Sequence, residues 1–434
     1  MTVPLMDIYE EHLDEASFLW VQWNRALVAP NYNLEDVSSL EERLLAHLDG
    51  LVLGGEPVAT QLLLPALDSE DPPRISAALW ALLAEPGLME LPKFVERVRA
   101  TALEGPLAAF RRALELNARP EVGEALLPLL KSQEPLLQAW ALEVLASRGQ
   151  FPRGAEVELL GHPDARVVVA VLRETPLLPR DVASRELPRL LADARPGVRE
   201  AAILGGMRSG VLAAWEACRK AVDARTQVER TSLVLLALGG DERDLMRLLA
   251  CTGVEAMRED SLWALGFSGR VEAAEACLEF MGPGPVAALA GEAFSAITGL
   301  TLEDAYVVAA EEEESLPPLE EDLARDLEPQ PEDALPAPAR EAVAAWWKDA
   351  RKDFVRGTRY LRGRAFSLDG LLEELARGSM RRRHVLALEL ALRSQGSCQF
   401  QTQAFTPRQY AALAQARDMR GRLPASPFPR MIGG

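Results

Sequence analysis

Three pairs of adjacent arginine and glutamate residues recur at matching positions along the chain. The pairs are Arg199 with Glu200, Glu229 with Arg230, and Arg258 with Glu259. Side chains at matching positions of a helical repeat stack in a row on one face. That row would be either a ladder of ion pairs between repeats, each worth less than about 1 kcal/mol when exposed, or a charged surface that recognises a partner. These six residues are our candidate binding site, and both interpretations remain open.

The other residue types that could do chemistry form no recognisable catalytic or metal-binding pattern. The four histidines are isolated in the sequence: His12, His47, His162 and His384. The four cysteines, Cys218, Cys251, Cys277 and Cys398, form no CxxC pair, so neither a disulfide framework nor a zinc site is indicated. Neither a hydrolytic triad nor a phosphate-binding loop is visible. We assign no catalytic residue, metal ligand or cofactor, leave enzymatic activity undecided and favour a non-enzymatic role.

The elements that would position the charged pairs are visible as a repeat. In the stretch RPGVREAAILGGMRSG, residues 195–210, an apolar or small residue recurs every four positions from Val198, which marks one face of a helix. Related stripes begin at positions 75, 107, 137, 167, 198, 228, 257 and 289, in steps of 29 to 32 residues. Five stripes end at Gly87, Gly149, Gly210, Gly240 and Gly269. Glycine best adopts the left-handed conformation that follows a helix.

Each repeat also contains a second apolar helical segment, separated from the first by turns rich in Gly, Pro and Asp. The two-residue alternation typical of strands is absent. A lone helical hairpin cannot bury its apolar face, whereas stacked hairpins share one core. We therefore predict an all-α fold: an α-solenoid of HEAT-like helical hairpins with a period of 30 to 31 residues and atypical helical caps.

The N-terminal part departs from this register. Residues 1–58 are expected to form a helical cap, because terminal units of repeat proteins are commonly atypical. One helix is expected over residues 5–26, and a second is expected to begin after the capping residue Asn33. We expect His47 to cap the end of that second helix rather than to bind a ligand. The repeat array then spans residues 59–302.

Charge is distributed unevenly over the rest of the chain. Residues 303–339 contain thirteen acidic residues and one arginine, a net charge of −12, and many prolines, so we expect a flexible segment. Residues 340–434 carry a net charge of +10 and are expected to form a basic helical region with one further hairpin. There Trp346 and Trp347 are expected to pack in the core rather than to form a ligand platform. Arg381–Arg383 are expected at a solvated helix start rather than on a phosphate.

Several blocks of the sequence resemble a known family. The short helix pairs resemble HEAT-like repeats, including the compact kind found in bilin lyases. Residues 10–55, with RLLAHLDGL from Arg43 to Leu51, resemble the N-terminal block of an uncharacterised bacterial HEAT-repeat family. AFSAITGL, AVAAWWKDARKDF and RYLRGRAF, which begin at residues 293, 342 and 359, resemble its later blocks. The resemblance covers most of the chain. It implies no catalytic residues, but it does imply an association with type VI secretion gene clusters.

Composition narrows the possible partners and the location. The chain of 434 residues has a net charge of −18, which argues against nucleic acid because phosphate binding needs a cationic surface. Binding of nucleic acid by the basic residues 340–434 is the least favoured alternative. No apolar run approaches the roughly 18 residues of a membrane span. The acidic N-terminal stretch does not resemble a signal peptide, so we expect a cytoplasmic protein.

These observations favour a scaffold or adaptor that binds a protein or an extended peptide along the concave face of the array. Repeat arrays offer a long binding surface, and an accessory role in a bacterial secretion system is what the family resemblance adds. The alternative is an enzyme similar to the HEAT-like lyases, with a small-molecule pocket in the concave face. That alternative requires titratable groups to converge in a cavity.

Overall fold

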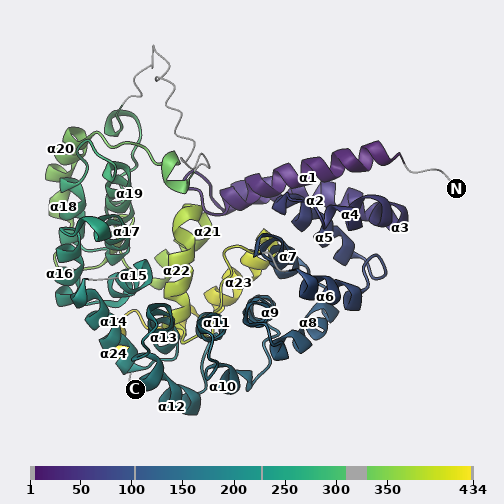
Figure 1. Ribbon diagram of the computed structural model, residues 1–434. Coiled ribbons are helices and arrows are strands. Elements are labelled where there is room, and N and C mark those ends of the chain that lie inside the picture. The colour runs from purple at the N-terminus through teal and green to yellow at the C-terminus, as the bar shows by residue number, and fades with distance from the viewer. Residues whose placement is uncertain (1–4, 102–103, 226–227, 309–329, 432–434) are drawn as a thin grey trace. The chain divides into compact units, whose positions relative to one another are not determined.

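The computed structural model describes residues 5–101, 104–225, 228–308 and 330–431, and their regular structure is almost entirely helical (Figure 1). Among these residues the only strands are two of two residues each. The predicted all-α fold is therefore confirmed. The described chain divides into two compact units, one of residues 5–28, 32–215 and 375–421, and one of residues 29–31, 216–374 and 422–431. Both units therefore contain part of the region that we treated as one C-terminal domain.

The first unit is built on five register helices, which contain the apolar stripes. They are α5 (Pro72–Ala84), α7 (Glu104–Leu116), α9 (Pro135–Ser147), α11 (Ala165–Glu174) and α13 (Pro196–Arg208). Proline begins α5, α9 and α13, where its missing N–H is not needed for a helical hydrogen bond. Their partners are the shorter α3 (Gly55–Val58), α4 (Leu64–Ala66), α6 (Leu91–Ala100), α8 (Glu121–Leu126), α10 (Ala155–Leu159) and α12 (Arg180–Leu190), with a π-helical turn at Ala59–Leu63 and a 3₁₀ turn at Leu127–Lys131.

Hydrogen bonds link neighbouring hairpins of this unit at a distance of about one repeat. The indole Nε1 of Trp140 donates to the carbonyl oxygen of Leu107, 33 residues earlier, at 2.6 Å. The Arg189 guanidinium donates to the carbonyl oxygen of Leu160, 29 residues earlier, at 3.0 Å. Each register helix from α5 to α11 also packs against the next one. The register read from the sequence therefore corresponds to physical stacking within this unit.

The apolar stripes of the register helices form the shared core. Val167 and Val171 of α11 and Val198 and Ala202 of α13 are fully buried in one apolar cluster. Burying a valine side chain completely contributes roughly 1.5–3 kcal/mol to stability. Because α11 and α13 supply residues to the same cluster, neither hairpin completes its core alone.

Helices outside the register complete the first unit. α1 (Met6–Ala26) packs against α2 (Leu34–Leu53), and the side chain of Asn33 caps α2 by accepting from the backbone N–H groups of Glu35 and Asp36. Both helices agree with their predicted positions. α22 (Met380–Arg393) packs against α13, and α23 (Thr406–Met419), followed by a 3₁₀ turn at Arg420–Arg422, packs against α2. Two helices from the C-terminal part of the chain thus return to this unit.

His47 does not cap a helix, contrary to our expectation. It lies inside α2, and its Nδ1 is 3.1 Å from the Nδ1 of His12 on α1. Gly50 makes room for this contact, because a Cβ there would lie only 3.2 Å from the His12 ring. Leu48 and Leu51 of the same motif are fully buried. The AHLDGL motif therefore joins the two N-terminal helices, and its buried leucines explain why α2 continues past the histidine.

Arg383 is fully buried in α22, which corrects the expectation of a solvated helix start. Its Nε donates to the carbonyl oxygen of Leu375 at 2.7 Å, and its Nη1 donates to Oε1 of Gln409 at 2.6 Å. Arg381 is buried as well. The physical reason is that α22 packs against α13 while Gln409 of α23 covers its first turns. Two of the three arginines of this run are therefore part of the interior.

The second unit continues the hairpin pattern. Its register helices are α15 (Arg230–Gly239), α17 (Arg258–Ser268) and α19 (Ala287–Thr298), and α17 packs against both of the others. The remaining helices are α16 (Glu242–Cys251), α18 (Val271–Glu279), α20 (Arg340–Ala350) and α24 (Phe428–Met431), with 3₁₀ turns at Glu255–Met257, Asp304–Tyr306, Pro331–Ala334 and Arg351–Asp353. Two helices, α14 (Leu212–Ala224) and α21 (Leu368–Arg377), begin in one unit and end in the other.

A short hairpin covers the C-terminal ends of the register helices in this unit. Its strands, β1 (Tyr360–Leu361) and β2 (Arg364–Ala365), pair antiparallel, although the sequence analysis predicts no strand. The N–H of Tyr360 donates to the carbonyl oxygen of Gly269 at 2.7 Å, and the N–H of Arg362 donates to that of Ala296 at 2.9 Å. The Arg359 guanidinium donates to the carbonyl oxygens of Leu238 and Phe267. The hairpin therefore satisfies carbonyl groups that a helix end leaves unpaired.

The glycines that end the stripes mostly have the predicted backbone. Gly87, Gly149, Gly210 and Gly269 all have positive φ. Gly240 is the exception, with φ −74° and an extended conformation. The reason is that Asp241 directly caps the next helix, α16, with its side chain, so the chain must turn out of α15 without a left-handed residue.

The acidic segment falls mostly outside the described residues, so its expected flexibility stays a prediction. Its two flanks pair with each other. The N–H of Val308 donates to the carbonyl oxygen of Ala337 at 2.9 Å, and that of Ala339 donates to Tyr306 at 2.8 Å. Beyond it, Trp347 of α20 is buried with its ring 5.3 Å from that of Phe294 on α19, as expected for a core residue.

Candidate functional site

In the first predicted charged pair, Arg199 binds the turn that precedes its own helix. Nη1 of Arg199, on α13, donates to the carbonyl oxygens of Asp193 and Ala194 at 2.7 and 3.0 Å. Glu200 is 7% exposed and therefore offers little surface to a partner. Arg199 therefore fixes the turn that precedes α13. This role differs from an ion pair with a glutamate of a neighbouring repeat.

The other four predicted residues lie in the second unit, at the starts of α15 and α17. Arg230 donates to Asp260 at 2.5 Å and so bridges the two register helices. Nε of Arg258 donates to the carbonyl oxygen of Thr252 at 3.1 Å. Glu229 is the residue preceding α15, and Glu259 is exposed in the first turn of α17. The carboxylate that bridges these repeats is thus Asp260, and recognition of a partner by these residues stays a prediction.

A different group of charged residues converges in the first unit, in a hollow of about 580 Å³ over three register helices. We call it the α7–α9–α11 hollow. It is lined by Glu104, Leu107, Ala108, Arg111 and Glu115 of α7, Leu136, Ala139, Trp140 and Glu143 of α9, and Arg166, Val169, Ala170, Arg173 and Glu174 of α11. On each helix these residues recur after three and four positions, some of them as adjacent pairs, so they share one face. The hollow is therefore a product of the repeat itself.

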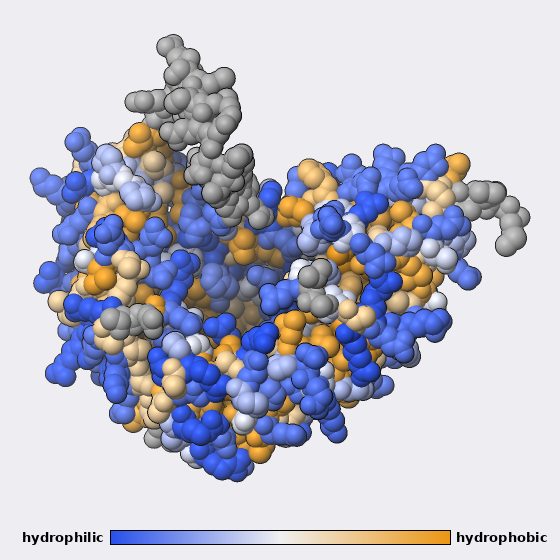
Figure 2. All heavy atoms as spheres, viewed as in Figure 1, coloured by the Kyte–Doolittle hydropathy of each residue, from blue (hydrophilic) through white to orange (hydrophobic). Residues whose placement is uncertain are grey.

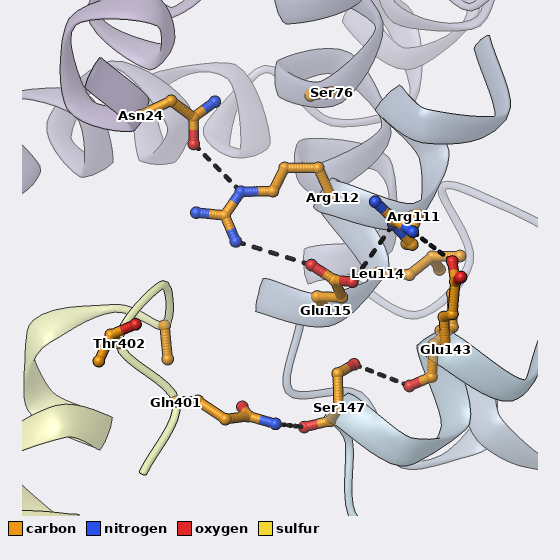
Figure 3. A network of polar contacts seen from close by, with 12 residues as sticks. Asn24, Ser76, Arg111, Arg112, Leu114, Glu115, Glu143, Ser147, Gln401 and Thr402 are labelled. Carbon is orange, nitrogen blue, oxygen red and sulfur yellow. Dashed lines mark hydrogen bonds and ion pairs between the residues drawn. The ribbon is translucent and has the colours of Figure 1, made fainter. Parts of the chain in front are cut away.

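One ion pair crosses this hollow from α7 to the next repeat, and others lie along α7 (Figure 3). Nη1 of Arg111 on α7 donates to Glu143 on α9, and its Nε lies 3.5 Å from Oε1 of Glu115. The next residue, Arg112, places Nη1 3.7 Å from Oε2 of the same Glu115. One carboxylate thus lies between two guanidinium groups that point to opposite sides of α7.

Burial affects the ionisation of two carboxyl groups in the hollow, Glu115 and Glu174. Burial raises the pKa of Glu115, against the attraction of Arg112 and Arg111. Burial also raises the pKa of Glu174 on α11, and the neighbouring Glu143 adds to the effect. A carboxyl group with a raised pKa holds its proton more readily than usual. A positive charge placed beside it would stabilise its ionised form.

A second, smaller hollow of about 320 Å³ adjoins the first, with Glu115 in both. We call it the Arg112 hollow; it is lined by Arg112, Glu115 and Leu116 of α7, Ser147 of α9 and the segment Phe400–Ala404. Gln401 and Arg408 each donate to the carbonyl oxygen of Ser147 at 2.7 Å. This wall therefore comes from the C-terminal part of the chain (Figure 3).

The segment that forms this wall is anchored to the N-terminal helices. The ring of Phe405 lies 5.1 Å from that of Trp23 and 6.3 Å from that of Trp80. The backbone N–H and the hydroxyl of Thr406 both donate to Glu41 at 2.9 Å, and Trp23 Nε1 donates to the same carboxylate at 3.2 Å. In this unit the C-terminal segment therefore covers part of the N-terminal helices.

Sequence reasoning did not find these residues. Glu115, Glu143 and Glu174 lie near the C-terminal ends of three consecutive register helices, and that regularity is the one signal that points to them. In a chain with 65 acidic residues it does not stand out. Side chains in view over the described helices are mostly hydrophilic (Figure 2), so hydropathy does not mark the site either.

The described residues offer no metal-binding or membrane-spanning alternative. No group of three or more histidine, cysteine, aspartate or glutamate side chains is arranged to hold a metal ion there. All four cysteines are buried and form no disulfide. Within the same residues, no helix has the length and apolar character of a membrane span.

Comparisons with known proteins give no function. No family model matches the sequence, and no curated protein matches it. Among solved structures, the crystal structure of an engineered protein matches 67% of this chain and 94% of its own, with 16% identity and a TM-score of 0.28. A likeness this distant carries no functional argument.

Proposed function

We propose that this protein is a non-enzymatic scaffold or adaptor that binds a segment of another protein in the α7–α9–α11 hollow. The observation that supports the proposal is the convergence of Arg111, Glu143 and Glu174, from three successive repeats, on a hollow of about 580 Å³. Apolar walls from Leu107 and Val169 accompany these charges. Protein-binding surfaces commonly combine such apolar contacts with charges that select the partner.

The charge of the hollow suggests which side chain the partner segment inserts. Glu115 and Glu174 have raised pKa values, mainly because they are buried. A lysine or arginine side chain placed between them would stabilise their ionised forms. We therefore propose a partner segment with a basic residue at its centre.

Affinity capture from native lysate with matched charge variants tests this proposal. Glu143→Lys reverses a charge inside the hollow, whereas Glu158→Lys makes the same change at an exposed position on α10. A specific protein should be captured by the wild type and by Glu158→Lys, and at least about tenfold less by Glu143→Lys. Equal capture by both variants, or no specific protein with the wild type, would contradict the proposal. Circular dichroism melts of both variants check that they are folded.

One observation favours an enzymatic alternative. Two carboxyl groups with raised pKa values, Glu115 and Glu174, line one hollow, and general acids in enzymes have this property. If the protein is an enzyme similar to the HEAT-like lyases, native mass spectrometry should detect a bound small molecule that Glu174→Gln loses. A wild type that binds only a protein segment would remove this alternative.

The resemblance of residues 10–55 to a bacterial HEAT-repeat family extends the proposal to a partner class. We propose that the partner is a component of a type VI secretion system and that the complex forms in the cytoplasm. Capture from a bacterium that has such a system should then recover one of its components. If Glu143→Lys captures the same component, that component binds elsewhere on the protein.

A further inference from the structure

Arg112 has a buried hydrogen-bond donor without an acceptor. Its Nε donates to Oδ1 of Asn24 at 3.1 Å, and its Nη1 lies 3.7 Å from Glu115. Its Nη2 is buried and has no hydrogen-bond partner among the described residues. In Figure 3 this third nitrogen points away from both partners, on the side of the segment that contains Thr402. A buried donor on a charged group is costly to leave unpaired and is rare in folded proteins.

The guanidinium of Arg112 is also under-neutralised. Its carbon lies 4.7 Å from the centre of the Trp23 ring, so part of its surroundings is apolar. Burial lowers the pKa of Arg112 to about 10, although Glu115 acts in the opposite direction. A cation in this situation is stabilised by an additional negative group.

Further positive charge lies around the same hollow. Arg408 donates to Ser147, which lines the Arg112 hollow. Arg148, the next residue, donates to the carbonyl oxygen of Leu114 at 2.6 Å. Burial lowers the pKa of both arginines, and Arg408 also lowers that of Arg148. Arg148 and Arg408 lie beside the hollow, whose own lining contains one guanidinium, Arg112, and one carboxyl group, Glu115.

We propose that the Arg112 hollow binds a carboxylate that pairs with the guanidinium of Arg112, which lines the hollow. The volume of about 320 Å³ fits an acidic side chain or a small organic acid rather than a larger ligand. A singly charged group fits better than a phosphate dianion, because Glu115 lines the same hollow. The site shares Glu115 with the α7–α9–α11 hollow, but it needs no protein partner if the carboxylate belongs to a free acid.

Titration calorimetry with two carboxylate probes tests the proposal on the full chain. The probes are glutarate and the peptide acetyl-Gly-Glu-Gly-amide, with acetyl-Gly-Gln-Gly-amide as the uncharged control. The protein variants are Arg112→Gln, which removes the donor, and Thr402→Trp, which fills the hollow without replacing Arg112. Arg185→Gln, at an exposed position on α12 that lines neither hollow, is the matched control.

The wild type and Arg185→Gln should bind at least one carboxylate probe, and the glutamine peptide should bind at least about tenfold more weakly. Arg112→Gln and Thr402→Trp should each weaken binding by about tenfold or more. Binding of glutarate would assign a free organic acid, and binding of the peptide alone would assign an acidic side chain. No binding to the wild type, equal binding of the glutamine peptide, or undiminished binding to both variants would overturn the proposal. If Arg112→Gln is unfolded by circular dichroism, Thr402→Trp alone decides, and loss of capture by Glu143→Lys remains a separate result.

Discussion

Glu174 shows how a single buried carboxyl group affects the whole fold's response to pH. It lies on α11 in the α7–α9–α11 hollow, where burial and Glu143 raise its pKa while Arg208 acts against them. Nη1 of Arg208 donates to the carbonyl oxygen of Arg173, so this guanidinium is committed to the backbone as well. The hollow therefore keeps a carboxyl group that is more stable protonated than the same group in the unfolded chain.

We predict that the wild type loses stability as pH rises, because of Glu174, and that Glu174→Gln does not show this loss. Below the ordinary value of 4.5 the carboxyl is protonated in both states. As pH rises the unfolded chain loses the proton first, so the stability due to the protonated group disappears as pH passes the raised folded pKa. Urea unfolding at about pH 4 and about pH 7 should show the variant gaining stability relative to the wild type at the higher pH.

Glu158→Gln, at an exposed position of α10, is the control for this measurement. Its difference in free energy of unfolding from the wild type should be the same at both pH values. A Glu174→Gln variant that tracks Glu158→Gln at both pH values would show that Glu174 titrates normally.

Among the secondary-structure elements, the junction of α17 with β1 places the strictest requirement on one residue. Gly269 ends α17 with φ +64°, and a Cβ there would lie 2.1 Å from the carbonyl oxygen of Tyr360. The left-handed backbone by itself costs other residues about 1–2 kcal/mol. The close approach of the hairpin adds a clash with backbone, which cannot move aside as a flexible side chain does.

We therefore expect Gly269→Ala to lower the free energy of unfolding by about 2 kcal/mol or more. Gly197→Ala is the matched control, because Gly197 lies in α13 without a positive φ, and a Cβ added there would meet nothing within 4 Å. Alanine favours a helix over glycine by up to about 0.5–1 kcal/mol, so the control should be neutral or stabilising. Urea unfolding measures both, and equal effects would mean that the hairpin does not constrain Gly269.

Helix α13 and the β1–β2 hairpin show what the sequence predicts about elements and what it does not. Val198, Ala202 and Gly210 predict a helix, its buried face and its left-handed end, because helix periodicity and glycine's backbone freedom are local properties. The hairpin at Tyr360 is not predicted, because two residues per strand give no alternation to detect. The hydrogen bonds to Gly269 join segments far apart in the sequence, so no local pattern reports them.

The candidate site is predictable to a lesser degree. Sequence reasoning placed charged residues on the register helices, but it selected those near the helix starts, such as Arg199 and Arg230. Arg111 and Glu143 meet in the C-terminal halves of α7 and α9. This pairing depends on the angle between stacked helices. Burial of Arg112 depends in addition on Trp23 and on the C-terminal segment.

At the scale of the chain, the first unit is closed by contacts between residues from its two ends. Thr406 and Glu41, which are 365 residues apart, share two hydrogen bonds to Oε1 of the carboxylate. Burial raises the pKa of Glu41, and its hydrogen bonds from Thr406 and Trp23 oppose that shift. Joining such distant segments costs loop entropy, so the contact must be stabilised by the apolar packing beside it.

Phe405 supplies that packing, and its replacement tests whether the C-terminal segment stabilises the N-terminal helices. Phe405→Ala removes the ring between Trp23 and Trp80, and deleting a buried phenylalanine ring typically costs about 3–5 kcal/mol. Because Phe405 is partly exposed, we expect the lower end of that range, about 3 kcal/mol. Tyr410→Ala on the exposed side of α23, where the ring is 45% exposed, should change stability by less than about 0.5 kcal/mol. Tryptophan fluorescence during urea unfolding follows both variants, since two indoles contact Phe405 directly. If the two substitutions cost the same, the segment would only cover the N-terminal helices, and the Arg112 hollow would lack a fixed wall.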